Sequence, residues 1–204
     1  MKRILCYGDS NTFGFDPEDN ANRFDEGTRW TCLLAKELGV GYRVMEEGLN
    51  GRTISSEGYT KYRKGNEYLL PCIDSHAPLD LIVVMLGTNE LNFELSAKEI
   101  AEMLEREIVR PIRKHRYEYG ERPKILVVVP AAVSECERDF LLCDGICVKS
   151  KGLAVEFEDV SKRNDCFFLS AVDLAVGSDG VHLTKDSHRE LASRLTKTVK
   201  EILG

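Results

Sequence analysis

Segments far apart in the chain carry the residue types that nucleophilic catalysis requires. Ser10 follows an apolar run near the start of the chain, and Asp179 and His182 lie three positions apart near its end. A serine hydroxyl is a weak nucleophile at neutral pH and needs a base within hydrogen-bond reach. Histidine suits that task because its pKa is about 6.5, and a carboxylate can hold the imidazole in the correct tautomer. We therefore expect Ser10 to be the nucleophile, His182 the base and Asp179 the residue that orients the base.

Two further segments could stabilise a tetrahedral intermediate of acyl transfer. Negative charge develops on one oxygen of that intermediate, and fixed N–H groups aimed at this oxygen lower the barrier. We expect the backbone N–H groups of Ser10 and Gly51, together with the side-chain amide of Asn89, to form this oxyanion hole. Glycine suits position 51 because it permits a turn with positive φ and a close approach of the backbone to a substrate.

The elements that must position these residues alternate along the chain. Short apolar runs predict strands, and longer amphipathic stretches predict helices. Strands are expected at 3–7, 42–46, 79–86, 124–129 and 166–169, and helices at 30–38, 96–112 and 184–203. This alternation predicts an α/β fold, a three-layer α/β/α sandwich with a central parallel sheet, built as a single domain over residues 1–204. Because such sheets bind ligands beyond the carboxyl ends of their strands, the four polar segments should meet at one edge.

The same segments resemble the blocks of the SGNH (GDSL-type) hydrolase family. Gly8-Asp9-Ser10 resembles the block that supplies the nucleophile, Gly51 falls at the glycine of the second block, and residues 87–90 (Gly-Thr-Asn-Glu) resemble the third block. Residues 179–182 (Asp-Gly-Val-His) match the D-x-x-H pattern of the last block. The resemblance extends from residue 3 to residue 203 and is strongest to bacterial arylesterase/acyltransferase-like members.

This resemblance implies a flavodoxin-like SGNH hydrolase fold and a serine esterase that cleaves small carboxylic esters, acetyl or aryl, through an acyl-enzyme. It also implies an acyltransferase side activity, since an alcohol can replace water, and copies of the chain could assemble into a homo-oligomer. Three features depart from the family pattern: Asn11 replaces the usual Leu, Glu90 replaces the usual Asp, and residues 134–150 do not resemble the proline-rich loop of the arylesterase branch.

Two other interpretations compete with the esterase. The small, polar stretch Gly8–Gly14 after the first strand could cradle a phosphate, as in a flavodoxin-like phosphate- or mononucleotide-binding protein without hydrolase activity. Against this, Asp9 would place an anion beside the phosphate, and neither G-x-x-x-x-G-K-[ST] nor G-x-G-x-x-G occurs. A binding domain that has lost catalysis is disfavoured because every catalytic position is filled.

Composition excludes several further classes of protein. Lys and Arg number 28 against 34 Asp and Glu, giving a net charge of −6, so a nucleic-acid partner is not expected. The longest apolar runs fall far short of the roughly 20 residues that span a bilayer, and the start of the chain lacks a signal-peptide core. We therefore expect a cytoplasmic protein with a small-molecule ester substrate and no membrane partner.

The seven cysteines predict neither disulfides nor a metal centre. Their number is odd, and reduced thiols are the usual state in the cytosol. Cys136, Cys143 and Cys147 do cluster, but spacings of seven and four residues are not a C-x-x-C pattern, and no histidine lies among them. The sequence therefore predicts no metal and no cofactor.

Two segments and three aromatic residues resist assignment from sequence. Residues 16–28 and 134–150 fit no regular element and are expected to be loops over one rim of the sheet. Phe13, Phe15 and Trp30 could line a substrate pocket or pack in the core, and the sequence leaves both alternatives open.

Overall fold

The strands form one parallel sheet, as the alternating pattern predicts. A computed structural model describes residues 1–19, 22–58, 60–134 and 145–204. In it the sheet has the order β2-β1-β3-β4-β5, and every neighbouring pair is parallel. The strands are β1 (Lys2–Gly8), β2 (Tyr42–Gly48), β3 (Leu81–Met85), β4 (Lys124–Val129) and β5 (Phe167–Ser170). Because β1 and β3 are parallel neighbours, their carboxyl ends lie next to each other at one edge.

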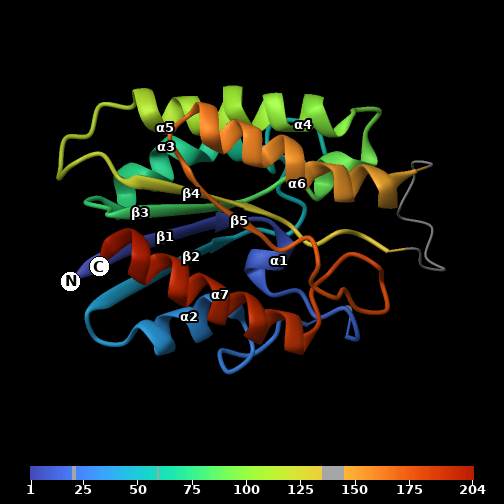
Figure 1. Ribbon diagram of the computed structural model, residues 1–204, viewed down its shortest axis with the longest axis horizontal. Helices are drawn as coiled ribbons and strands as arrows, with labels where there is room; N and C mark the ends of the chain where they lie inside the picture. The colour runs from blue at the N-terminus through green and yellow to red at the C-terminus, as the bar shows by residue number, and fades with distance from the viewer. Residues whose placement is uncertain (20–21, 59, 135–144) are drawn as a thin grey trace.

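Helices cover both faces of the sheet and complete the three layers (Figure 1). One face carries α2 (Trp30–Leu38) and α7 (Lys185–Leu203), which pack on each other. The opposite face carries α3 (Gly65–His76), α4 (Ala97–Leu104), α5 (Arg110–Lys114) and α6 (Ile146–Arg163). The α/β/α sandwich is thereby confirmed.

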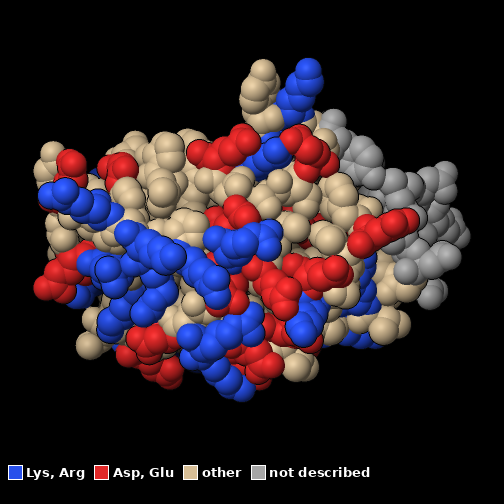
Figure 2. All heavy atoms as spheres, turned by 90° about the horizontal axis from the view of Figure 1, so that it is seen from above, with Lys and Arg blue, Asp and Glu red and all other residues tan. Residues whose placement is uncertain are grey.

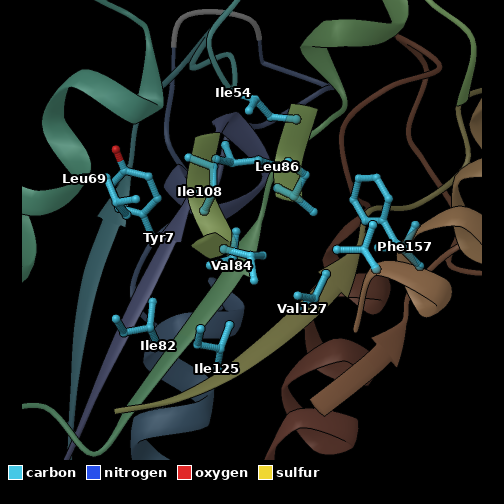
Figure 3. Packing of buried hydrophobic residues seen from close by; sticks show 14 of the residues in the cluster. Tyr7, Ile54, Leu69, Ile82, Val84, Leu86, Ile108, Ile125, Val127 and Phe157 are labelled. Carbon is cyan, nitrogen blue, oxygen red and sulfur yellow. The ribbon is translucent and has the colours of Figure 1, made fainter. Parts of the chain in front are cut away.

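Alternate residues of each strand serve the two faces. In β3, Ile82 and Val84 join the core beneath α3 to α6, whereas Leu81, Val83 and Met85 join the core beneath α2 and α7. All five residues of β3 are buried, which explains why its sequence is continuously apolar rather than alternating. Figure 3 shows the first core, in which the side chains of the central strands meet those of the covering helices.

The helical stretch after Ser96 begins as predicted and contains an irregular turn. Ser96 and Glu99 form a reciprocal capping box at the start of α4. A π-helical turn, Glu105–Val109, then separates α4 from α5. The Glu105 carboxylate there contacts Arg110, Arg163 and Asn164, which ties this turn to the end of α6.

The sequence analysis was wrong or silent on several elements. The prediction of a loop over 134–150 is wrong from residue 146 onward, because α6 begins there, and residues 135–144 lie outside the described part. The body of α6 was not predicted, and no bounds were predicted for α3. Residues 16–19 and 22–28 contain no helix or strand, consistent with the expected loop.

The described helices are short or polar, and charges of both signs cover one face of the molecule (Figure 2). Within the described residues, every helix is too short or too polar to span a bilayer. The face above α3 to α6 shows acidic and basic side chains side by side rather than one dominant sign (Figure 2). Some of these charges pair along helices, as Lys162 does with Glu158.

Candidate functional site

Ser10 lies directly beyond the carboxyl end of β1, at the start of the short helix α1 (Ser10–Phe13). The preceding Gly8 packs so tightly that a Cβ there would lie 2.0 Å from the Thr12 hydroxyl and 2.7 Å from the Met85 carbonyl oxygen. Asp9 caps α1, since its carboxylate accepts a hydrogen bond from the backbone N–H of Asn11 at 2.9 Å. The sharp turn from strand to helix therefore requires the residue types of this motif.

Asp179 and His182 lie on the loop between β5 and α7, and backbone hydrogen bonds fix their arrangement. The Asp179 Oδ1 atom accepts from the backbone N–H groups of Val181 and His182, both at 2.9 Å. Its Oδ2 atom lies 2.6 Å from His182 Nδ1. Burial raises the pKa of Asp179, but the hydrogen bonds from His182 and Val181 outweigh burial and hold the pKa below its usual value. The carboxylate is thus ionised and aimed at the imidazole.

Ser10 and His182, from the first and last parts of the chain, are in contact. His182 Nε2 lies 2.8 Å from Ser10 Oγ, although 172 positions separate the residues. The ring of Phe15 lies against the imidazole, with 4.2 Å between the ring centres. The imidazole therefore has a serine on one nitrogen, a buried carboxylate on the other and an aromatic ring on one face, and it is held in a single orientation.

Gly51 and Asn89 line the same cavity as the histidine. Gly51 has φ of +70°, a conformation that favours glycine, in the turn that follows β2. Asn89 begins a 3₁₀ turn (Asn89–Asn92) after β3, and its Nδ2 atom donates to the Arg52 carbonyl at 2.9 Å. A side-chain amide nitrogen has two hydrogens, so one remains for a further acceptor. Together with Ser10 and His182, these residues line a cavity of about 280 Å³.

The structure thus brings together Ser10, Asp179, His182, Gly51 and Asn89, which the sequence analysis singled out. It also separates the three aromatic residues. Phe15 lines the cavity, whereas Trp30 is buried in the core beneath α2, and Phe13 lies under the Arg23 guanidinium.

Comparison with known proteins decides the family. The model of the GDSL-like lipase/acylhydrolase family matches residues 6–190, which include all four motif segments. The chain belongs to the GDSL-like lipase/acylhydrolase family. It is an ester hydrolase, and the comparisons give no support to the phosphate- or mononucleotide-binding alternative. Among curated proteins, none matches the chain.

Solved structures of similar hydrolases cover the whole chain. An aryl esterase from M. smegmatis is 33% identical with a TM-score of 0.89, and both chains are covered completely. A carbohydrate acetylesterase family member from Sinorhizobium meliloti is 34% identical with a TM-score of 0.93, again with both chains fully covered. A putative arylesterase from Agrobacterium tumefaciens is 29% identical over the full length of both chains, with a TM-score of 0.91.

In this GDSL-like hydrolase the unusual Asn11 connects the serine to the histidine loop. Its buried side chain accepts from the Leu183 backbone N–H at 2.8 Å and donates to the Val181 carbonyl at 3.4 Å. These two hydrogen bonds hold the backbone on both sides of His182. The sequence marked Asn11 as a departure from the family pattern but gave no indication of these partners, which are 170 or more positions away.

Glu90, the second departure, supports the opposite side of the cleft. Its side chain is fully buried, and Oε1 accepts from the backbone N–H of Ile54 at 2.6 Å. Burial, together with the nearby carboxylate of Asp9, raises the pKa of Glu90 to about 8. Burial likewise raises the pKa of Asp9 to about 6. The hydrolase therefore has two buried carboxyl groups, Asp9 and Glu90, each next in sequence to a residue that lines the cleft.

Proposed function

We propose that Ser10, His182 and Asp179 form the catalytic triad of this ester hydrolase. The observation that carries the proposal is the unbroken series of short contacts, 2.8 Å from Ser10 Oγ to His182 Nε2 and 2.6 Å from His182 Nδ1 to Asp179 Oδ2. A nucleophile, a base and a group that orients the base within these distances are what acyl transfer requires.

The reaction proceeds in two stages in this proposal. Ser10 Oγ attacks the ester carbonyl carbon while His182 Nε2 takes the serine proton. The N–H groups of Ser10 and Gly51 and the Asn89 amide receive the negative oxygen of the tetrahedral intermediate. His182 then gives the proton to the departing alcohol, which leaves an acyl-enzyme. Water, deprotonated by His182, attacks the acyl-enzyme and releases the acid and Ser10.

The cavity favours a small acyl or aryl group as substrate. Its volume of about 280 Å³ lies at the lower end of ligand pockets, which typically hold about 300–1,000 Å³. The walls combine apolar Phe15, Val133 and Val181 with the amides of Asn50 and Asn92. The names of the similar structures, aryl esterase and carbohydrate acetylesterase, support small carboxylic esters. An acyl-enzyme in such a site could also pass its acyl group to an added alcohol.

The test combines a substrate series with the loss of the nucleophile. Hydrolysis of p-nitrophenyl esters should fall as the acyl chain lengthens beyond acetyl, and acetylated sugars are assayed beside them. Ser10→Ala should lose nearly all turnover, while Ser170→Ala, which removes a hydroxyl from the carboxyl end of β5, should retain it. A sulfonyl fluoride should transfer its sulfonyl group to Ser10 Oγ in the wild type, with loss of fluoride and the serine proton, and should modify no serine in Ser10→Ala. Turnover of Ser10→Ala within a few-fold of the wild type would reject the proposed nucleophile.

A further inference from the structure

A second cluster of reactive side chains lies outside the catalytic cleft. Glu47, the penultimate residue of β2, faces Cys72 and His76 on α3. One carboxylate oxygen, the thiol sulfur and one imidazole nitrogen all lie within 4.8 Å of one another. His76 Nε2 and Glu47 Oε1 are already in contact at 2.8 Å. Within the described residues, this is the one group of three such side chains close enough to share an ion.

The local structure explains why these three side chains converge. Cys72 and His76 are four positions apart on α3, so the helix presents them on the same side, one turn apart. Tyr7 of β1, which neighbours Glu47 in the sheet, donates its hydroxyl hydrogen to the Gly65 carbonyl at 2.6 Å and so fixes the start of α3 over these strands. The cluster is therefore built from two rigid elements rather than from a loop.

We propose that Glu47, Cys72 and His76 bind a divalent transition-metal ion of the zinc type. Sulfur, imidazole nitrogen and carboxylate oxygen are the three donors that zinc takes in proteins. Tetrahedral zinc bonds place ligand atoms roughly 3.3–3.6 Å apart, so the side chains need only small adjustments from their present separations. Their burial is graded: the Cys72 side chain is enclosed, whereas the side chains of His76 and Glu47 are 28% and 21% exposed and leave a path for the ion.

A fourth coordination position would face a cavity rather than the core. Glu47 is part of the lining of a cavity of about 510 Å³, together with Arg52 and Tyr68. Zinc with three protein ligands keeps its remaining position for water or a small ligand. The site thus has the donor set and the access of an exchangeable metal site.

The charges around the cluster are compatible with a cation. The Arg52 guanidinium, which has the same sign of charge as the ion, interacts electrostatically with Cys72. It is held by the Gly8 and Glu47 carbonyl oxygens and by the ring of Tyr7, 4.2 Å away. A thiolate and a carboxylate together neutralise a divalent ion, so Arg52 would face a centre without net charge. The hydrogen bond from Arg52 to the Glu47 carbonyl also fixes the backbone of this ligand.

Two simpler roles for these residues fit the structure less well. A plain His–carboxylate pair occurs elsewhere on the same face, where His115 lies 2.6 Å from Asp74. Among the residues that the structure describes, that pair has no third metal-ligating side chain close to it. A cysteine nucleophile is disfavoured because Cys72 is enclosed, and burial raises the pKa of its thiol to about 12. Metal binding would explain why Cys72 lies beside the Glu47–His76 pair.

The experiment titrates the full-length protein, first stripped with EDTA, with Co²⁺ and then with Zn²⁺. Thiolate-bound Co²⁺ has a charge-transfer absorption band in the near ultraviolet. One equivalent of Co²⁺ should produce this band in the wild type, and Zn²⁺ should abolish it by displacement. Cys72→Ser should lose the band, and His76→Gln should weaken binding by about 10- to 100-fold or more.

Control variants separate this site from the other thiols and histidines. Cys166→Ser and His115→Gln should bind Co²⁺ as the wild type does, as should a variant in which Cys136 and Cys143 are both serine. Melting in EDTA verifies that each variant is folded, and His76→Gln, at the last residue of α3, carries the test if Cys72→Ser does not fold. The proposal is overturned by a wild type without the thiolate band, by a band that persists without Cys72, or by wild-type affinity in His76→Gln.

Discussion

The buried carboxyl group of Glu90 should make the protein less stable as the pH rises from 5 to 8, and Glu90→Gln should remove most of that loss. Glu90 is fully buried, and burial raises its pKa from 4.5 to about 8, with a further contribution from the Asp9 carboxylate. Glutamine has nearly the same shape and keeps an oxygen that can accept from the Ile54 N–H, but it cannot ionise. The substitution therefore isolates the effect of the charge.

The sign and size of the effect follow from proton binding. Between pH 4.5 and 8 the folded protein holds a proton on Glu90 that the unfolded chain has released, so the free energy of unfolding falls as the pH rises. The contribution of this carboxyl group is fully present below about pH 4.5 and is lost as the pH passes through about 8. One unit of pKa corresponds to about 1.4 kcal/mol, so the shift amounts to a loss on the order of 3–5 kcal/mol over this range.

The measurement is urea unfolding of the wild type and of Glu90→Gln at several pH values between 5 and 8. The free energy of unfolding of the variant should rise relative to that of the wild type as the pH increases. Glu94→Gln, which changes an exposed carboxyl group four positions away, should keep the pH dependence of the wild type. If the curves for the wild type and Glu90→Gln run parallel from pH 5 to 8, Glu90 does not titrate as its burial implies.

Three substitutions test other parts of the molecule. Asn89→Ala should lower kcat by about 10²–10³ if the amide stabilises the oxyanion, and a loss under threefold would assign Asn89 a structural role only. Asn11→Ala leaves the buried N–H of Leu183 without its acceptor, which should reduce the free energy of unfolding by about 1–3 kcal/mol. It should also lower kcat more than it raises KM, because the His182 loop loses its attachment; an unchanged kcat would contradict that attachment. Phe157→Ala empties a fully buried position beneath α6 and should cost about 3–5 kcal/mol in urea unfolding, while a cost below about 1 kcal/mol would contradict the packing described for it.

The sequence was most informative about the strands and the residues that follow them. β3 and β4 are almost wholly apolar because both faces of the sheet are covered, and a continuous apolar run of that length is readily recognised. Since all strands are parallel, the residues after each strand arrive at the same edge, and the grouping of Ser10, Gly51 and Asn89 follows from that topology. The loop that carries His182 reaches the same edge because α7, which follows this loop, packs in the same core as one side of β1.

The two helices whose bounds were not predicted, α3 and α6, have weak local signals. α3 contains Pro71 in its interior. The N-cap of α6 is Gly145, which offers no capping side chain, and the helix itself contains Gly152. Proline and glycine both lower helix propensity, so these stretches lack the usual marks of a helix. Their stability comes from packing in the core, for example by Phe157, which a local pattern does not reveal.

The spacing of residues in the sequence did not predict the contacts that support the site, for a different reason. Asn11 and Glu90 stood out only as departures from a family pattern, because their partners lie far away along the chain. The cluster of Glu47, Cys72 and His76 was not considered, since its members come from β2 and α3 rather than from one short motif. Contacts of this kind become visible only when the elements are assembled.

The wide separation of Ser10 and His182 along the chain also has a consequence for how activity is acquired. A partly folded chain in which the segment after β5 has not docked beside α2 would lack His182 at the cleft, even with the sheet and the other helices formed. Regain of ester hydrolysis during refolding should therefore lag behind the regain of helical circular dichroism. An enzymatic assay would thus report chains in which both segments have docked, whereas circular dichroism reports helix formation alone.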